Sequence, residues 1–187
     1  PFPGTICAPV NDEIVHGIPS KERVLQDGDI ISIDTGVSYS GFFGDAACTF
    51  AVGEISEDRQ RLLDITLESL HRGVNAVRAG ATLGDIGHAI ESLVIPSGFG
   101  LVRDYAGHGI GRRLHEAPQV PNYGRPGNGI TLKAGMTFCV EPMVMSGSEE
   151  VKNLSDNWTV VTADGSDAAH FEHSLLVTPD GGEILTP

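Results

Sequence analysis

The sequence predicts an α/β fold whose two similar halves face each other across a shared cleft. Three patterns support this prediction: strand-like segments around a turn in residues 28–52, two amphipathic helices between residues 56 and 96, and a motif that recurs 107 residues later. The chain has 187 residues, and a chain above ~150 residues buries about 70% of the surface that it exposes when unfolded. We therefore expect residues 1–187 to form a single domain.

Composition argues against several classes of protein. The sequence has 12 basic and 25 acidic residues, a formal charge of −13, which is unfavourable for binding nucleic acid. Its three cysteines are odd in number and lack the Cys-x-x-Cys spacing, which argues against a disulfide framework or a structural zinc site. No segment approaches the ~20 apolar residues of a membrane span, and no signal segment is evident, so we expect a cytoplasmic protein. Because the chain starts at Pro1 without a methionine, we expect the natural protein to extend further upstream.

Residues 28–52 are predicted to form a β-hairpin that turns at Tyr39-Ser40. With that turn the numbers of cross-strand partners add up to 79, which places Asp34 opposite Asp45. Directly opposed residues have Cβ atoms roughly 4.5–5.5 Å apart, and like charges at that separation are destabilising unless a cation lies between them. The alternative is that both acids are solvated on the surface, but the apolar strand around Asp34 disfavours it.

Two helices are predicted to follow the hairpin. Ser56 is a favourable N-cap for the first helix, and Gly80 is expected to end it. Thr82 and Asp85 form the pattern of a capping box for the second helix, which Pro96 is expected to stop. The inward-facing positions are Leu62, Thr66, Leu70, Val74 and Val77 in the first helix, and Leu83, Ile86, Ile90, Leu93 and Val94 in the second.

A motif of the first half recurs in the second half. The spacing Leu-x-x-Gly-x-x-x-x-x-acid runs from Leu25 to Asp34 and again from Leu132 to Glu141, each time as a turn before a strand that carries a carboxylate. Further strands are predicted over residues 101–105, 137–145, 158–162 and 170–177, with a turn-rich stretch over residues 116–129.

Four acids in apolar strands indicate a metal centre. They are Asp34, Asp45, Glu141 and Glu172. Burying four carboxylates is costly unless they are neutralised, and two divalent cations would cancel their charge. His108, in the run Gly107-His-Gly-Ile-Gly, adds an imidazole at a place where backbone can approach closely. This set of oxygen and imidazole ligands suits Mn²⁺, Fe²⁺, Co²⁺ or Zn²⁺, and it is unlike the thiolate ligands of a structural zinc site.

The remaining histidines are less specific. His170 lies two residues before Glu172, on the same face of the predicted strand, so it either orients that ligand or is structural. His71, His88 and His173 are interpreted as structural or exposed, since His71 and His88 fall within the predicted helices.

The motifs of the chain resemble those of bacterial type I methionine aminopeptidases, in order and over nearly the whole sequence. They are His16-Gly-Ile-Pro, Asp34 with Asp45, Gly107-His-Gly-Ile-Gly, His115, Glu141-Pro-Met-Val and Phe171-Glu-His. The resemblance implies the pita-bread fold, in which halves related by a pseudo-two-fold axis form a curved antiparallel sheet backed by helices. It also implies a catalytic domain that removes the initiator methionine from nascent proteins and peptides by two-metal hydrolysis.

The resemblance further implies a role for each matching residue. One metal ion would bind Asp45, His108, Glu141 and Glu172, and the other Asp34, Asp45 and Glu172. Two such ions can activate a water molecule for attack on a peptide carbonyl. Glu141 would also move protons, and His16 and His115 would form hydrogen bonds with the scissile peptide.

The resemblance implies a pocket for the methionine side chain beside the metals. Its walls would be Phe2, Cys7, His16, Leu114, His115 and Trp158. Leu114 stands where the family often has an aromatic residue and Phe2 where it often has tyrosine, so we expect a wider or more apolar pocket edge. The alternative for Cys7 is an ordinary packing role. The family also has an N-terminal helix, which we expect upstream of Pro1.

Two other functions are compatible with parts of this pattern. An aminopeptidase P or prolidase has the same fold and a string like His115-Glu-Ala-Pro118, but His16-Gly-Ile-Pro and the Pro-Met after Glu141 favour the methionine enzymes. A non-catalytic module of this fold would bind proteins through its cleft, although such modules typically lose metal ligands and all five are present here. The expected partners are polypeptides that begin with methionine, with the ribosome as a further partner, and the chain is expected to be a monomer.

Overall fold

The N-terminal hairpin consists of strands β2 (Ile30–Tyr39) and β3 (Phe42–Ala51) in the computed structural model, which describes residues 1–187. The turn is formed by Ser40 and Gly41, where φ is 50° and 83°. Positive φ at both central residues is the geometry of the tight hairpin turns that glycine favours. The turn therefore lies one residue later than predicted, and the numbers of cross-strand partners add up to 81.

The predicted pairing of Asp34 with Asp45 is wrong because of this register. Asp34 lies opposite Ala47, and Asp45 lies opposite Gly36. Side chains alternate between the two faces of a strand, so the difference of two in the sum leaves both acids on their common face. Asp34 and Asp45 are thus diagonal neighbours on one face of the hairpin.

Both predicted helices are present, as α1 (Glu57–Ala76) and α2 (Leu83–Val94). The hydroxyl of Ser56 caps the start of α1. Thr82 and Asp85 form the predicted capping box at the start of α2.

The ends of the helices differ in how well they were predicted. α1 ends at Ala76 rather than at Gly80, whose φ of 90° belongs to the connection that leads into α2. After α2, Pro96 falls in a short 3-10 helix, η1 (Ile95–Ser97), because proline cannot supply the N–H that an α-helix needs.

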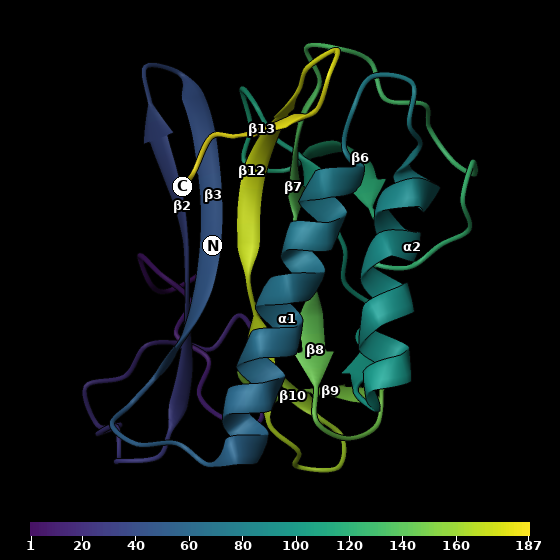
Figure 1. Cartoon of the computed structure of the whole chain (residues 1–187). Helices are drawn as coiled ribbons and strands as arrows, with labels where there is room; N and C mark the ends of the chain where they lie inside the picture. Colours follow the sequence, from purple (N-terminus) through teal and green to yellow (C-terminus); the bar gives the residue numbers. More distant parts are fainter.

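The structure has thirteen strands in all. Besides β2 and β3 they are β1 (Glu13–Val15), β4 (Gly100–Leu101), β5 (Gly107–Gly109), β6 (Glu116–Val120), β7 (Thr137–Val140), β8 (Met143–Met145), β9 (Val151–Asn153), β10 (Val160–Thr162), β11 (Ala168–His170), β12 (Glu172–Val177) and β13 (Gly182–Ile184). The main sheet has the order β2-β3-β12-β7-β5-β6, with β13 paired to β12, and all pairs are antiparallel. α1 and α2 lie side by side over one face of it (Figure 1). This curled sheet backed by helices is the pita-bread fold that the motifs imply.

Two predicted strands are each broken next to a carboxylate. Residues 137–145 form β7 and β8, which are separated by Glu141 and Pro142, because Pro142 has no N–H to donate to a neighbouring strand. Residues 170–177 are divided at Phe171 between β11 and β12. β7 and β12 belong to the main sheet, whereas β8 and β11 belong to the three-stranded sheet β11-β8-β4. Glu141 and Glu172 therefore lie where the chain passes from one sheet to the other.

One predicted strand and one predicted turn region also differ from the structure. The strand predicted for residues 101–105 is reduced to β4, and the chain bends after Leu101. The stretch of residues 116–129 that was predicted as turns begins with strand β6. Pro118 obscured this strand in the sequence, and the structure accommodates it because β6 is at the edge of the main sheet.

The recurring motif has the same local structure in both halves. Gly28 and Gly135 have φ of 98° and 91°, and each donates its N–H to a valine carbonyl, at 2.8 Å and 2.9 Å. β2 then begins at Ile30 and β7 at Thr137, the same 107 residues apart. The repeat seen in the sequence therefore has a structural counterpart.

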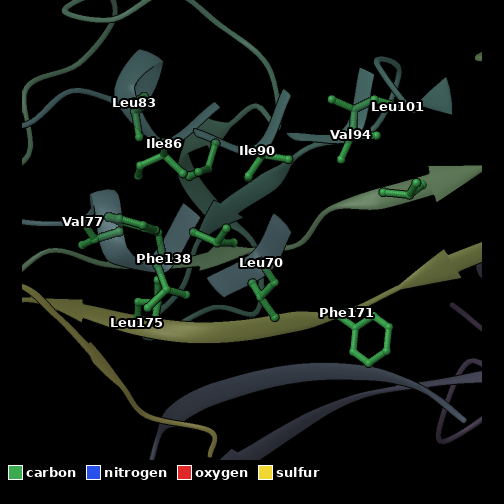
Figure 2. Packing of buried hydrophobic residues seen from close by; sticks show 14 of the residues in the cluster. Leu70, Val77, Leu83, Ile86, Ile90, Val94, Leu101, Phe138, Phe171 and Leu175 are labelled. Carbon is green, nitrogen blue, oxygen red and sulfur yellow. The ribbon is translucent and has the colours of Figure 1, made fainter. Parts of the chain in front are cut away.

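The largest hydrophobic core lies between the helices and the main sheet. Figure 2 shows Leu70 of α1 and Ile86 and Ile90 of α2 packed toward Phe138 of β7 and Leu175 of β12. All five side chains are at most 1% exposed. Of the ten helix positions predicted to face inward, nine are buried, and Leu93 is partly buried. Neither helix combines the length and the apolar character that a bilayer crossing needs.

Candidate active site

All five predicted metal ligands line one cavity. The cavity has a volume of about 520 Å³ and is lined by Asp34, Asp45, His108, Glu141 and Glu172, among others. The ligand atoms of Asp34, Asp45 and Glu172 all lie within 4.8 Å of one another. β2, β3, β5, β12 and the break after β7 each supply one of the five residues.

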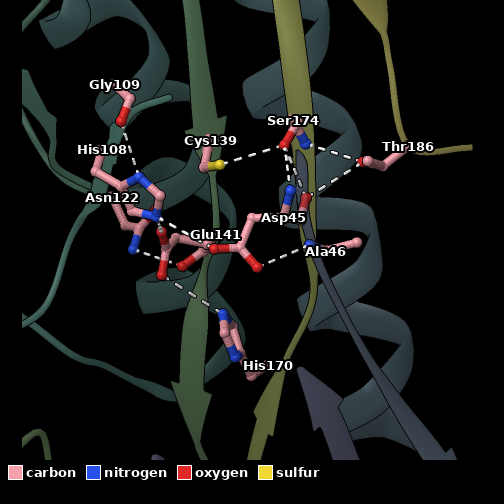
Figure 3. Close-up of polar contacts among 10 residues, drawn as sticks. All are labelled: Asp45, Ala46, His108, Gly109, Asn122, Cys139, Glu141, His170, Ser174 and Thr186. Atoms are coloured by element: carbon pink, nitrogen blue, oxygen red, sulfur yellow. Dashed lines mark hydrogen bonds and ion pairs between the residues drawn. The ribbon is translucent and has the colours of Figure 1, made fainter. Parts of the chain in front are cut away.

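The imidazole of His108 is oriented by the backbone of the next residue, Gly109. Its Nδ1 lies 3.0 Å from the carbonyl oxygen of Gly109, so Nδ1 carries the proton and donates it (Figure 3). Nε2 is left with a free lone pair, 3.7 Å from Oδ2 of Asp45 and 3.5 Å from Oε1 of Glu141. A hydrogen-bonded Nδ1 with a free Nε2 is the arrangement typical of a histidine that ligates a metal.

Burial and mutual repulsion disfavour the charged forms of the carboxylates. Burial, together with the charge of Asp34, raises the pKa of Asp45 to about 7. Burial and the neighbouring carboxylates also raise the pKa values of Glu141 and Glu172 well above the ordinary glutamate value. These shifts favour the protonated forms of the three acids, and a positive charge among them would favour the ionised forms.

The residues present fit divalent cations. Oε1 of Glu141 and Oε1 of Glu172 are buried without a hydrogen-bond partner, which is costly for a carboxylate and is relieved by a metal ion. The ion pairs of the arginine side chains all lie outside this cluster, and the basic groups within 4.0 Å of its carboxylates are imidazoles. Oxygen-rich ligands with imidazole suit first-row divalent ions.

His16 and His115 lie at the same cavity. The ring centroid of His115 is 4.3 Å from that of His108, and its ligand atom also forms a group with those of Asp45 and His108. His115 is exposed at the edge of the site, in a segment without regular structure, as its spacing from His108 indicated. His16 packs edge-on against Tyr105 at 5.8 Å, and burial lowers its pKa, so the ring is neutral near pH 7.

A second cavity of about 280 Å³ adjoins the acids. All six residues predicted to form the substrate pocket line it, namely Phe2, Cys7, His16, Leu114, His115 and Trp158. The rings of Phe2 and Trp158 meet edge to face at 5.3 Å. Burial, together with the charge of Asp34, raises the pKa of the Cys7 thiol to about 12, so Cys7 is a neutral wall residue. Their predicted roles in substrate binding stay predictions.

Gly36 and Tyr105 also line the two cavities and were not predicted from the sequence. A Cβ atom at Gly36 would lie 2.8 Å from Cδ1 of Leu114, so glycine leaves room for a wall of the second cavity. A glycine inside a strand is a signal of such a close approach. Tyr105 lines the first cavity next to His16, but nothing in the sequence around it distinguishes it from a core aromatic residue.

Two polar residues that support the acids were also missed. The side chain of Asn122 is fully buried and donates from Nδ2 to the carbonyl of Glu141 at 3.0 Å, which fixes the break between β7 and β8. The hydroxyl of Ser174 contacts both backbone groups of Asp45 (Figure 3). A serine among the apolar residues of β12 was the available signal.

His170 is buried in the same cavity but does not hydrogen-bond Glu172. Its Nε2 lies 3.7 Å from Oε2 of Glu141 instead. The break at Phe171 assigns the two residues to different strands, but both side chains face this cavity, as predicted, and their ligand atoms lie within 4.8 Å of each other.

Comparisons with known proteins identify the relatives of the chain. The sequence profile of metallopeptidase family M24 matches residues 1–179. The methionine aminopeptidase of Clostridium acetobutylicum is 54% identical over 185 residues, covering 99% of this chain and 74% of that protein. Methionine aminopeptidase 1 of Bacillus subtilis is 53% identical, with the same coverage. The crystal structure of the methionine aminopeptidase from Thermotoga maritima has a TM-score of 0.95 at 50% identity, covering 97% of this chain and 73% of that one. This chain is therefore a member of metallopeptidase family M24.

Proposed function

We propose that this chain is a methionine aminopeptidase, a metal-dependent hydrolase that removes the N-terminal methionine from proteins and peptides. The observation that carries the proposal is the convergence of four buried or partly buried carboxylates and His108 at a cavity next to a second, partly apolar one. The identity of about one half to enzymes of this name supports it.

We propose that the site holds two divalent ions. Asp45, His108, Glu141 and Glu172 would bind one, and Asp34, Asp45 and Glu172 the other. When bound, such ions polarise a carbonyl oxygen and make water a stronger nucleophile. Mn²⁺, Fe²⁺, Co²⁺ and Zn²⁺ all suit this ligand set, and cellular supply would select among them.

The protein side chains would bind the substrate and move its protons. A Glu141 carboxylate oxygen would take a proton from the attacking water and pass it to the departing amine, because a carboxylate held in the cavity can act first as a base and then as an acid. His16, just after β1, and His115, between β5 and β6, would each donate a hydrogen bond to the scissile peptide. Fixed donors of this kind stabilise the negative charge that develops on a carbonyl oxygen during hydrolysis.

The second cavity would accept the methionine side chain. Phe2 and Trp158 offer aromatic edges and faces to the thioether sulfur, a contact worth roughly 0.3–1.5 kcal/mol. Leu114 and the neutral thiol of Cys7 would complete an apolar wall. A pocket that ends at the metal ligands Asp34 and Asp45 would leave the first peptide bond at the metals.

We also propose action on nascent chains in the cytoplasm, by a monomer that works near the ribosome. The three cysteines are unpaired, which is compatible with a reducing compartment.

A peptide assay tests the proposed function. Protein stripped of metal and reloaded with Mn²⁺ or Co²⁺ should release methionine from Met-Ala-Ser and leave an Ala-Pro peptide nearly intact. Faster cleavage of the Ala-Pro peptide would instead indicate a proline-specific peptidase. Binding of a protein partner without cleavage of either peptide would indicate a non-catalytic module.

A further inference from the structure

His170 is a buried imidazole without a hydrogen-bond partner. The residue is 1% exposed, and neither Nδ1 nor Nε2 has a partner in the structure. A buried polar group in that condition is costly, and native proteins rarely retain one without a function or a ligand. The ring lies in the cavity that the metal ligands line.

The backbone of His170 is held in place by Thr49 of β3. The hydroxyl of Thr49 accepts a hydrogen bond from the N–H of His170 and donates to its carbonyl, both at 2.9 Å. Thr49 is itself 4% exposed and contacts the hydroxyl of Ser32 at 2.8 Å. The imidazole is therefore presented from a fixed backbone, although the ring has no partner of its own.

The distances around His170 are those between two donors on one ion. Its Nε2 lies 3.7 Å from Oε2 of Glu141, which is longer than the roughly 2.7–3.2 Å of an N–H···O hydrogen bond. Two donors about 2.0–2.2 Å from one ion at a tetrahedral angle are roughly 3.4 Å apart. His108 stands at the same kind of distance from the other oxygen of Glu141, 3.5 Å from Nε2 to Oε1.

Glu172 completes the group. Ligand atoms of Glu141, His170 and Glu172 all lie within 4.8 Å of one another, and Oε1 of both glutamates is buried without a partner. One cation among these three residues would satisfy the imidazole and the carboxylates together. Figure 3 shows His108 and His170 on opposite sides of the Glu141 carboxylate.

We propose that His170 is a further ligand of the metal centre, so that the centre has imidazoles on both sides of Glu141. The proposal rests on the metal centre of the proposed function and adds a sixth protein ligand to the five that the sequence motifs imply. A second imidazole favours Co²⁺ and Zn²⁺ over Mn²⁺, which prefers oxygen ligands.

Proton NMR of the Co²⁺-loaded protein tests the proposal directly. Cobalt shifts the exchangeable ring N–H proton of each coordinated imidazole far outside the normal spectral range. We expect His170→Gln, which keeps a polar side chain of similar length, to lack one shifted signal of the wild type. The matched control is His88→Ala, which removes an exposed imidazole on α2 and should keep every shifted signal. The same number of shifted signals in His170→Gln and in the wild type would overturn the proposal.

Metal selectivity provides a second readout, independent of peptide cleavage. Calorimetric titration of the stripped proteins should give a Co²⁺ affinity at least about tenfold weaker in His170→Gln, with a markedly smaller change for Mn²⁺. Equal weakening for both metals would mean that His170 acts from outside the coordination sphere, and would overturn the proposal.

A measurement on the wild-type protein alone avoids any folding defect that the variant has. With ¹⁵N-labelled histidine, the number of coordinated rings can be counted in wild-type protein, where we expect the ring of His170 among them. Methionine release is measured on the same sample. Release without coordination of His170 would overturn this proposal and leave the proposed function standing, whereas failure to bind Co²⁺ or to release methionine would overturn both.

Discussion

The hydroxyl of Ser174 binds both backbone groups of Asp45, accepting from the N–H at 3.0 Å and donating to the carbonyl at 2.8 Å. The β3–β12 ladder pairs Glu172 with Ala47 and His173 with Ala46, and no further pair follows. At the next position the backbone of Ser174 turns to the C-terminal segment, donating its N–H to Thr186 Oγ1 at 3.0 Å. A side chain thus replaces the missing ladder bonds at the point where the sheet opens around a candidate metal ligand.

Removing this hydroxyl should loosen Asp45. In Ser174→Ala two buried backbone groups lose a partner, so we expect a loss of about 1–3 kcal/mol in the free energy of unfolding. Metal affinity should also fall, whereas Ser174→Thr should retain both properties. Urea denaturation and metal titration are the measurements. The control is Thr178→Ala, since Thr178 makes the same two bonds to Gly181 at a turn far from the acids. Equal metal affinity in Ser174→Ala and Thr178→Ala would argue against a positioning role.

His115 should affect turnover more than metal content. Its ring is exposed at the edge of the site, 4.3 Å from that of His108, where it can contact a bound peptide. We expect His115→Ala to lower kcat by about 10²–10³-fold, the usual effect of losing a donor to a developing oxyanion. Elemental analysis should give unchanged metal content. Loss of metal from this variant would instead make His115 a ligand, in line with its position near Asp45.

The metal-free protein should respond to pH through Asp45. Its pKa is raised from 3.8 to about 7 by burial and by Asp34, so the folded state holds a proton that the unfolded state releases. Asp45 therefore stabilises the fold less as pH rises from about 4 to 7. Asp45→Asn cannot titrate, so the stability of wild type relative to this variant should fall by at least about 1 kcal/mol between pH 5 and pH 7.5. The lowered pKa values of the partly buried His16 and His108 make stability rise with pH. Because both proteins contain these histidines, their contribution cancels in the comparison.

Chemical denaturation at the two pH values, in the presence of a chelator, measures this difference. Saturating Mn²⁺ should reverse it, because the metal would bind the ionised carboxylate. A relative stability that rises with pH in the metal-free proteins would contradict the burial argument.

A methyl group at Gly36 should narrow the second cavity. The Cβ of Gly36→Ala would lie 2.8 Å from Cδ1 of Leu114 and 3.6 Å from Oδ1 of Asp45. We expect kcat/KM for a methionyl peptide to fall roughly tenfold, as one methyl group in a pocket commonly costs. The double variant Gly36→Ala, Leu114→Ala should recover part of the loss, because the shortened residue 114 removes the contact. If the losses in kcat/KM of the two single variants instead add up in the double variant, the contact with Leu114 is not the cause of the effect.

Much of the site was predictable because the chemistry resides in residues with unusual neighbours. Acids in apolar strands and a histidine between glycines are visible in one dimension, and the structure brings these residues to one cavity. The hairpin register was not predictable in the same way, because it depends on whether Tyr39 or Gly41 takes part in the turn. The role of Ser174 depends on a contact with a residue 129 positions away, which the local pattern of β12 does not contain.

The strand breaks illustrate a second limit. Residues 137–145 have the composition of one continuous strand, yet Pro142 ends the ladder, and the carboxylate of Glu141 is left at the junction of two sheets. The proline was visible in the sequence. The sequence did not show that the break would direct the Glu141 carboxylate into the cavity, because this depends on how the two sheets are arranged.

Methionine release from Met-Ala-Ser, followed together with bound metal as Mn²⁺ or Co²⁺ is returned to stripped protein, tests whether this chain is a metal-dependent aminopeptidase. We predict that release is absent without metal, rises with metal bound, and is lost in Asp45→Asn as its metal content falls. Methionine release that persists at full rate in the stripped protein or in Asp45→Asn would contradict the metallopeptidase mechanism.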